Sequence, residues 1–242
     1  MESYGKFSRI YDELINEDID YQKMADFIMS YTKKYSYYLD LGTGTGNLSS
    51  LISSFFKETY LVDSSPDMLT IASDKFINED IPYQAFAIPM NEIQFPKKFN
   101  LITSSIDSIN YLIEEDDVKK LFIKVFSHLE DDGIFIFDLN SPYKIKEILG
   151  NNEYIYNGED LVYTWQNTLD GDVVEMDLNF FVKDGEHYDR FEEIHLERSY
   201  EVEDIRDWLK EANLKLVSLF PGYEEGPILT NTERFVFIAR KR

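Results

Sequence analysis

Apolar residues between positions 37 and 140 occur in short runs that alternate with segments of helical spacing. The runs cover residues 37–41, 60–63, 83–86, 100–105 and 134–138, and runs of this length are typical of strands. Helices are expected after residue 47, from Ser65 onward and over about 117–128, with Gly133 ending the last of them. Strands that alternate with helices pair in parallel and are covered on both faces, so the pattern predicts a doubly wound α/β fold.

The alternation stops after residue 150. Residues 154–156, 161–168, 173–182 and 188–198 have strand character and are separated by the turn signals Asn157-Gly158, Asp170-Gly171 and Asp184-Gly185, which predicts an antiparallel meander. A helix around Ile205 and strands over 214–220 and 234–240 then complete the chain. We expect a core formed by 37–148 and 200–242, an antiparallel β cap inserted at 149–199, and an N-terminal helical lid over 1–36.

Three glycines, Gly42, Gly44 and Gly46, follow the first predicted strand and precede a helix. Glycine allows the backbone to turn sharply there and to approach a ligand closely. The spacing lacks the third intervening residue of the dinucleotide-binding fingerprint, which weakens a nicotinamide or flavin interpretation. Asp63 ends the second strand, 21 residues after Gly42, where a carboxylate can accept hydrogen bonds from both hydroxyls of a ribose. The sequence therefore predicts a ligand that carries a nucleoside.

Four segments, 39–46, 61–69, 99–102 and 129–135, resemble in order and spacing the class I S-adenosylmethionine-dependent methyltransferases. The resemblance implies a Rossmann-like, mostly parallel seven-stranded sheet with an antiparallel last strand, S-adenosyl-L-methionine as cofactor, and methyl transfer to nitrogen or oxygen of a small-molecule acceptor. It also implies cofactor contacts from the following residues: Tyr11, Asp40, Gly42, Thr43, Gly44, Gly46, Asp63, Ser64, Met68, Ile88, Pro89, Met90 and Ser105.

One segment departs from the pattern of similar enzymes. These often carry an acidic residue after the third strand that accepts a hydrogen bond from the adenine amino group, whereas this chain reads Ala87-Ile88-Pro89-Met90-Asn91. We expect the backbone N–H of Met90 and apolar contact with Ile88 to hold the adenine instead. The departure also motivates a second hypothesis, a non-catalytic cofactor-binding or regulatory protein. A third hypothesis, a nicotinamide-dependent oxidoreductase, depends only on the glycine turn and Asp63.

Composition limits the partners. The 242 residues include 24 basic and 46 acidic residues, a net charge of −22, and no cysteine. This excess disfavours nucleic acid and anionic membranes as partners, because both are bound mainly through lysine and arginine. The absence of cysteine excludes disulfides and thiolate metal ligands, and no cluster has metal-ligand spacing. We expect a cytoplasmic monomer or weak homodimer, with a small molecule such as an amine as acceptor.

Two residues are candidates for catalysis. Tyr111 follows the fourth strand, where similar enzymes meet the acceptor, and it could orient or deprotonate that molecule; nearby Asp107 could bind an amine. The alternative is a packed tyrosine beside a surface aspartate. His195 lies on the last cap strand and could act as a base near neutral pH, although a lone histidine on a strand is more often structural. The cap carboxylates Asp177, Glu192, Glu193 and Glu197 are interpreted as a solvated face that could favour a cationic acceptor.

Overall fold

The computed structural model describes Asp12 and residues 19–242. The first described helix is α2 (Tyr21–Tyr31), which begins where the side chain of Asp20 accepts a hydrogen bond from the backbone N–H of Lys23. Its apolar face is buried, as the spacing predicted. Of the rest of the expected lid, Asp12, residues 19–20 and residues 32–36 are described, and residues 1–11 and 13–18 lie outside the described residues.

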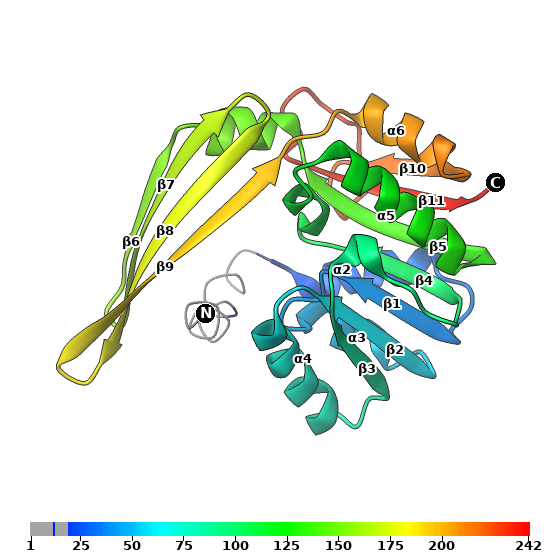
Figure 1. Cartoon of the computed structure of the whole chain (residues 1–242), viewed down its shortest axis with the longest axis horizontal. Helices are drawn as coiled ribbons and strands as arrows, with labels where there is room; N and C mark the ends of the chain where they lie inside the picture. The colour runs from blue at the N-terminus through cyan, green and yellow to red at the C-terminus, as the bar shows by residue number, and fades with distance from the viewer. Residues whose placement is uncertain (1–11, 13–18) are drawn as a thin grey trace.

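Seven strands form the main sheet (Figure 1). They are β1 (Tyr37–Leu41), β2 (Glu58–Asp63), β3 (Tyr83–Ala87), β4 (Phe99–Ser104), β5 (Leu129–Asn140), β10 (Leu214–Phe220) and β11 (Arg234–Lys241). Their order is β10-β11-β5-β4-β1-β2-β3, and only β11 runs antiparallel to its neighbours, β5 and β10. The mostly parallel, doubly wound, Rossmann-like fold with an antiparallel last strand is thereby confirmed.

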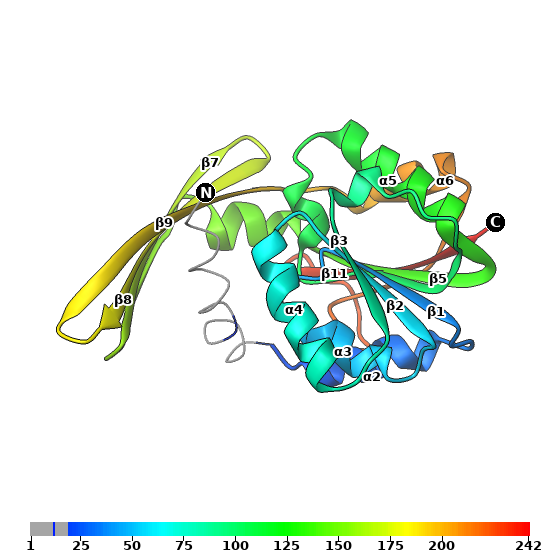
Figure 2. The ribbon, with the colours of Figure 1, turned by 60° about the horizontal axis from the view of Figure 1, so that its bottom comes forward.

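Helices cover both faces of this sheet (Figure 2). Helices α5 (Glu115–His128) and α6 (Val202–Glu211) pack on one face, while α2, α3 (Asn47–Ser53) and α4 (Pro66–Asn78) lie on the other. Neighbouring strand residues point to opposite faces, so Tyr38 joins the cluster with α2 and Leu39 joins the cluster with α5. Three short helical turns, η1 (Met90–Glu92), η2 (Ser108–Tyr111) and η3 (Lys144–Leu149), follow β3, β4 and β5.

The expected role of Gly133 was wrong. Helix α5 ends at His128 and β5 begins at Leu129, so Gly133 lies inside the strand. A Cβ at Gly133 would lie 2.9 Å from the carbonyl oxygen of Phe99, at a point where the register between β4 and β5 shifts. The glycine therefore permits close approach of two strands rather than ending a helix.

The inserted segment forms a separate four-stranded antiparallel sheet, the cap (Figure 1). It consists of β6 (Glu153–Asn157), β7 (Leu161–Asp170), β8 (Val173–Asp184) and β9 (His187–Arg198), close to the predicted ranges. On one face, the rings of Tyr163, Phe180 and Phe191 form a continuous aromatic row across β7, β8 and β9. The expected solvated face was wrong in part, because Glu193 and Glu197 are buried while Asp177 and Glu192 are exposed.

No helix among the described residues combines the length and apolar character needed to cross a membrane.

Candidate active site

The turn after β1 is built on its three glycines. Gly42, Gly44 and Gly46 have φ angles of +73°, +56° and +79°, a conformation that side-chain-bearing residues rarely adopt. A Cβ on Gly42 would lie 2.5 Å from the Oγ of Ser108, whereas a Cβ on Gly44 would have no heavy atom within 4 Å. The first glycine therefore lets the turn after β1 pack against the turn after β4, and the second leaves open space beside the backbone.

Asp63 holds this turn from the end of β2. Its Oδ2 accepts a hydrogen bond from the backbone N–H of Gly44 at 2.8 Å, and its Oδ1 accepts one from Ser65 at 2.8 Å. Burial raises the pKa of Asp63 above its ordinary value. The backbone of Ser64 interacts with the same group, and because a carboxylate has about four acceptor positions, it keeps capacity for a ligand hydroxyl.

A small cavity of about 40 Å³ opens beside the turn. Asp40, Thr43, Ser105 and Ile106 contribute to its lining together with Gly42 and Gly44. Asp40 is buried at the end of β1, its Oδ1 accepts a hydrogen bond from Thr103 at 2.6 Å, and burial raises its pKa to about 6. The structure thus brings together several of the predicted cofactor residues from β1 and β4.

The other predicted cofactor residues follow β2 and β3, except for Tyr11. The Cε of Met90 would lie 3.3 Å from a Cβ on Gly42, so the segment after β3 borders the glycine turn. Ile88 is half-buried, Pro89 and Ser64 are exposed, and Met68 is buried in a small apolar cluster with residues of the cap. Tyr11 lies outside the described residues.

Asp12 contacts the glycine turn directly, a contact that the sequence did not suggest. Its Oδ1 accepts hydrogen bonds from Thr45 Oγ1 at 2.5 Å and Asn47 Nδ2 at 2.9 Å, and its Oδ2 pairs with Lys75 Nζ at 2.8 Å. The turn is thereby tied to a position in the N-terminal segment, as an N-terminal lid would require.

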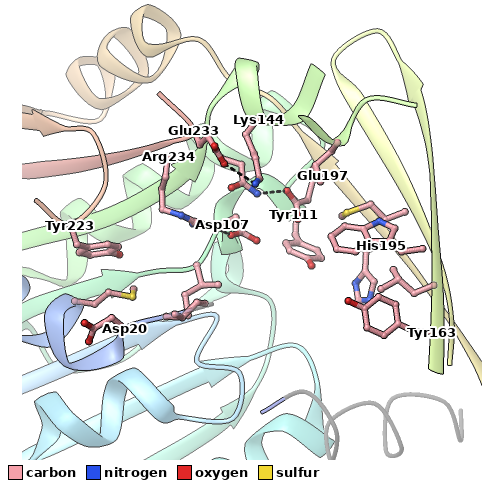
Figure 3. Close-up of a pocket in the computed structure, with 18 of the residues that line it drawn as sticks. Asp20, Asp107, Tyr111, Lys144, Tyr163, His195, Glu197, Tyr223, Glu233 and Arg234 are labelled. Atoms are coloured by element: carbon pink, nitrogen blue, oxygen red, sulfur yellow. Dashed lines mark hydrogen bonds and ion pairs between the residues drawn. The ribbon is translucent and has the colours of Figure 1, made fainter. Parts of the chain in front are cut away.

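A larger cavity of about 830 Å³, here called the acceptor cavity, lies between the carboxyl ends of the core strands and the cap (Figure 3). The predicted residues Asp107, Tyr111 and His195 all line it. The rings of Tyr111 and His195 meet edge to face with centroids 5.8 Å apart. Apolar and aromatic side chains of the cap form one wall: Tyr163, Trp165, Met176, Leu178 and Phe180.

Asp107 is already paired with a cation. Arg234 Nη2, from β11, lies 2.6 Å from Asp107 Oδ1, and Nη1 of the same guanidinium pairs with the fully buried Asp138. Because this cation already neutralises Asp107, the aspartate is not an isolated anchor for an amine. Sequence reasoning missed Arg234 and recognised Asp138 only as the end of the fifth predicted strand; both residues come from strands far from Asp107 in the chain.

Glu197, which was expected on a solvated face of the cap, is a second acid in the acceptor cavity. It is 3% exposed and accepts a hydrogen bond from Asn140 Nδ2 at 2.9 Å (Figure 3). Burial raises the pKa of Glu197 well above its ordinary value, and the negative charge of the nearby Asp107 is the second cause. By contrast, burial lowers the pKa of His195, so the neutral imidazole predominates at pH 7. The period-two pattern of β9 could have identified Glu197, since it lies on the same strand face as His195.

The residues present fit an adenosyl sulfonium cofactor. The open side of Gly44 admits a ligand against the backbone, and Asp63 stands beside it with acceptor capacity for ribose hydroxyls. The segment after β3, with Ile88 and Met90, supplies apolar surface and no carboxylate. When bound, S-adenosylmethionine supplies a methyl group that its sulfonium has already activated.

Comparison with known proteins agrees with this geometry. Residues 39–133 match the family model described as a methyltransferase domain. A protein of Geobacillus sp. (strain WCH70), named provisionally as a methyltransferase, is 32% identical over 99% of this chain and 100% of its own length. The crystal structure of an S-adenosylmethionine-dependent methyltransferase from Clostridium acetobutylicum ATCC 824 is 40% identical, covers 98% of both chains and superposes with a TM-score of 0.93.

A more distant solved structure shares the fold. The sugar N-methyltransferase of Streptoalloteichus sp. ATCC 53650 is 18% identical, with 96% of this chain and 93% of that chain covered and a TM-score of 0.77. The two chains therefore share the overall fold. Taken with the glycine turn, Asp63 and the full-length similarity to the Geobacillus and Clostridium proteins, these findings show that the chain belongs to the class I S-adenosylmethionine-dependent methyltransferases.

Proposed function

We propose that this enzyme transfers the methyl group of S-adenosylmethionine to a nitrogen or oxygen atom of a small molecule bound in the acceptor cavity. The observation that carries the proposal is that the small cavity at the glycine turn and the acceptor cavity share one lining residue, Ile106. A molecule in the larger cavity is thereby adjacent to the cofactor site. The volume of about 830 Å³ is within the range of small-molecule sites.

An amine is the acceptor group that we favour. The buried Glu197 supplies a proton acceptor to one end of the cavity, and the aromatic side chains of the cap supply surface for an apolar or ring-shaped body. The Streptoalloteichus protein, which shares the fold, is a sugar N-methyltransferase. A hydroxyl acceptor would use the same cavity with a base nearby, so the proposal also covers methyl transfer to oxygen.

The residues have distinct parts in this proposal. An ammonium group entering the cavity would lose one proton to Glu197 or to the neutral imidazole of His195, leaving a nitrogen lone pair. That lone pair would bond to the methyl carbon while the carbon–sulfur bond breaks, its electrons going to sulfur. Tyr111 and the aromatic wall would orient the acceptor and exclude water. The cofactor and the family do not support the nicotinamide-dependent or non-catalytic hypotheses.

Incorporation of labelled methyl groups tests the proposal. Purified enzyme is incubated with methyl-labelled S-adenosylmethionine and separate sets of amines, amino sugars and hydroxylated compounds, and products are identified by mass spectrometry. We expect products among the amines, formed more slowly by an Asp63→Ala variant when the cofactor concentration is limiting. Turnover restricted to a protein or nucleic-acid substrate would overturn the proposal.

A further inference from the structure

The turn that follows β4 has an unfavourable backbone conformation. Ile106 and Asp107 are consecutive non-glycine residues with φ angles of +57° and +53°. A β-branched residue with positive φ is a conformational outlier, because its side chain crowds the backbone. Outliers of this kind persist only where surrounding structure holds them, and they cluster at functional sites.

The fully buried carboxylate of Asp138, on β5, holds this turn. Its Oδ2 accepts a hydrogen bond from the backbone N–H of Ile106 and its Oδ1 accepts one from Asp107, both at 2.8 Å. Tyr223 and Arg234 donate hydrogen bonds to the same carboxylate. Two adjacent N–H groups in left-handed residues converge on one anion, so the carboxylate compensates the strained backbone.

The turn forms the boundary between the two cavities. Ile106 lines both of them, and Asp107 lines the acceptor cavity, where Arg234 also holds its side chain (Figure 3). The hydroxyl of Ser108 lies 2.8 Å from the carbonyl oxygen of Ser105 and 3.3 Å from that of Gly42, which joins the turn to the glycine turn. A small change in this turn therefore moves one wall of each cavity.

We propose that Asp138 is a positioning residue that keeps Ile106 and Asp107 in the left-handed conformation and thereby sets the wall between cofactor and acceptor. Asp138 itself is fully buried and lines neither cavity. It acts through the backbone of its two partners, with Arg234 fixing its orientation from one side and Tyr223 from the other. The proposal uses the cofactor of the family and does not depend on whether the acceptor is an amine.

The Asp138→Asn variant tests this role. Asparagine offers one carbonyl oxygen, so one of the two backbone N–H groups would face an NH₂ group instead of an acceptor. We expect amide hydrogen exchange at Ile106 and Asp107 to accelerate at least tenfold, and affinity for S-adenosylhomocysteine, measured by calorimetry, to fall about tenfold. Asp131→Asn is the matched control on the same strand, because that side chain is 94% exposed, and it should change neither quantity.

A second substitution separates positioning from general stabilisation. Glycine adopts positive φ without cost, so adding Ile106→Gly to Asp138→Asn should recover at least threefold of the lost affinity for S-adenosylhomocysteine. Two results would overturn the proposal. One is that Asp138→Asn changes neither the affinity for S-adenosylhomocysteine nor the exchange of the two amides. The other is that Asp138→Asn lowers the affinity and Ile106→Gly does not restore it. If Asp138→Asn fails to fold, Tyr223→Phe takes its place: removing one donor to Asp138 should accelerate exchange at the same two amides, and unchanged exchange would contradict the role.

Discussion

The carboxylate of Asp63 accepts a hydrogen bond from the backbone N–H of Gly44 at 2.8 Å, so the ends of two adjacent strands are joined at the cofactor site. We therefore expect two functions for the aspartate that the sequence did not separate. It orders the glycine turn, and it keeps capacity to accept hydrogen bonds from a ribose. Substitutions at Asp63 consequently affect the shape of the turn as well as the ligand contact.

Replacing Asp63 with alanine should weaken binding of S-adenosylhomocysteine by about 1.5 to 3 kcal/mol, the usual range for a hydrogen bond to a charged group. Isothermal titration calorimetry measures this directly, with circular dichroism to verify the fold. Asp74→Ala, an exposed position on α4, is the control and should bind normally. Equal affinity in a folded Asp63→Ala variant would remove this residue from the site.

Gly44 and Gly171 provide a matched pair. Both have positive φ, +56° and +61°, and a Cβ on either would meet nothing within 4 Å. Alanine at each position should therefore destabilise the protein by a similar amount, about 1 to 2 kcal/mol, because the backbone strain is alike. Only Gly44→Ala should lower affinity for S-adenosylhomocysteine, since Gly171 lies in the turn between β7 and β8. Urea unfolding measures the stability of both variants, and calorimetry measures their affinity for S-adenosylhomocysteine. Equal affinities in the two variants would argue against close approach of the ligand at Gly44.

Asp40 makes stability depend on pH. Burial raises its folded-state pKa to about 6 from an ordinary 3.8, so the folded protein binds its proton more tightly than the unfolded chain does. Its contribution to stability is complete below pH 3.8 and is lost as pH rises through about 6. Asparagine, which has no such proton, should gain stability relative to the parent as pH rises from 4 to 7, by up to about 3 kcal/mol. Urea unfolding of both proteins at several pH values measures this difference, and parallel curves would contradict it.

Glu197→Gln tests the proton acceptor once an amine acceptor is in hand. If Glu197 takes the proton, the kcat of the variant should fall about 10²- to 10⁴-fold. The variant should also lose the pH dependence of kcat that the ionisation of Glu197 causes. Glu192→Gln lies on the same strand with an exposed side chain and serves as the control. Retention of the parent pH profile by Glu197→Gln, with loss of activity in His195→Gln, would transfer the role to His195.

The order of elements, the sheet type and the cap were predictable from local patterns. Strand and helix periodicity, the glycine spacing and the turn dipeptides depend on neighbouring residues, and these were enough to locate β1 to β5, the four cap strands and the last two strands. The same local patterns failed at Gly133. They indicated a helix terminus there, because the contact of Gly133 with Phe99 comes from another strand and leaves no local signal.

The amino-acid sequence by itself determined the fold class, the cofactor and the glycine turn with Asp63, because residues close together in the chain carry those signals. Only the tertiary structure decided which polar groups share the acceptor cavity. Asp138 and Arg234 reach Asp107 from β5 and β11, and no spacing in the chain could reveal that grouping. Glu197 reaches the cavity from the cap, and although the alternation along β9 puts it on the face of His195, only the tertiary structure shows that this face lines the cavity. Burial and charge neutralisation arise from contacts between residues that are distant in the chain. The sequence therefore indicated a solvated carboxylate at Glu197 and an unpaired one at Asp107.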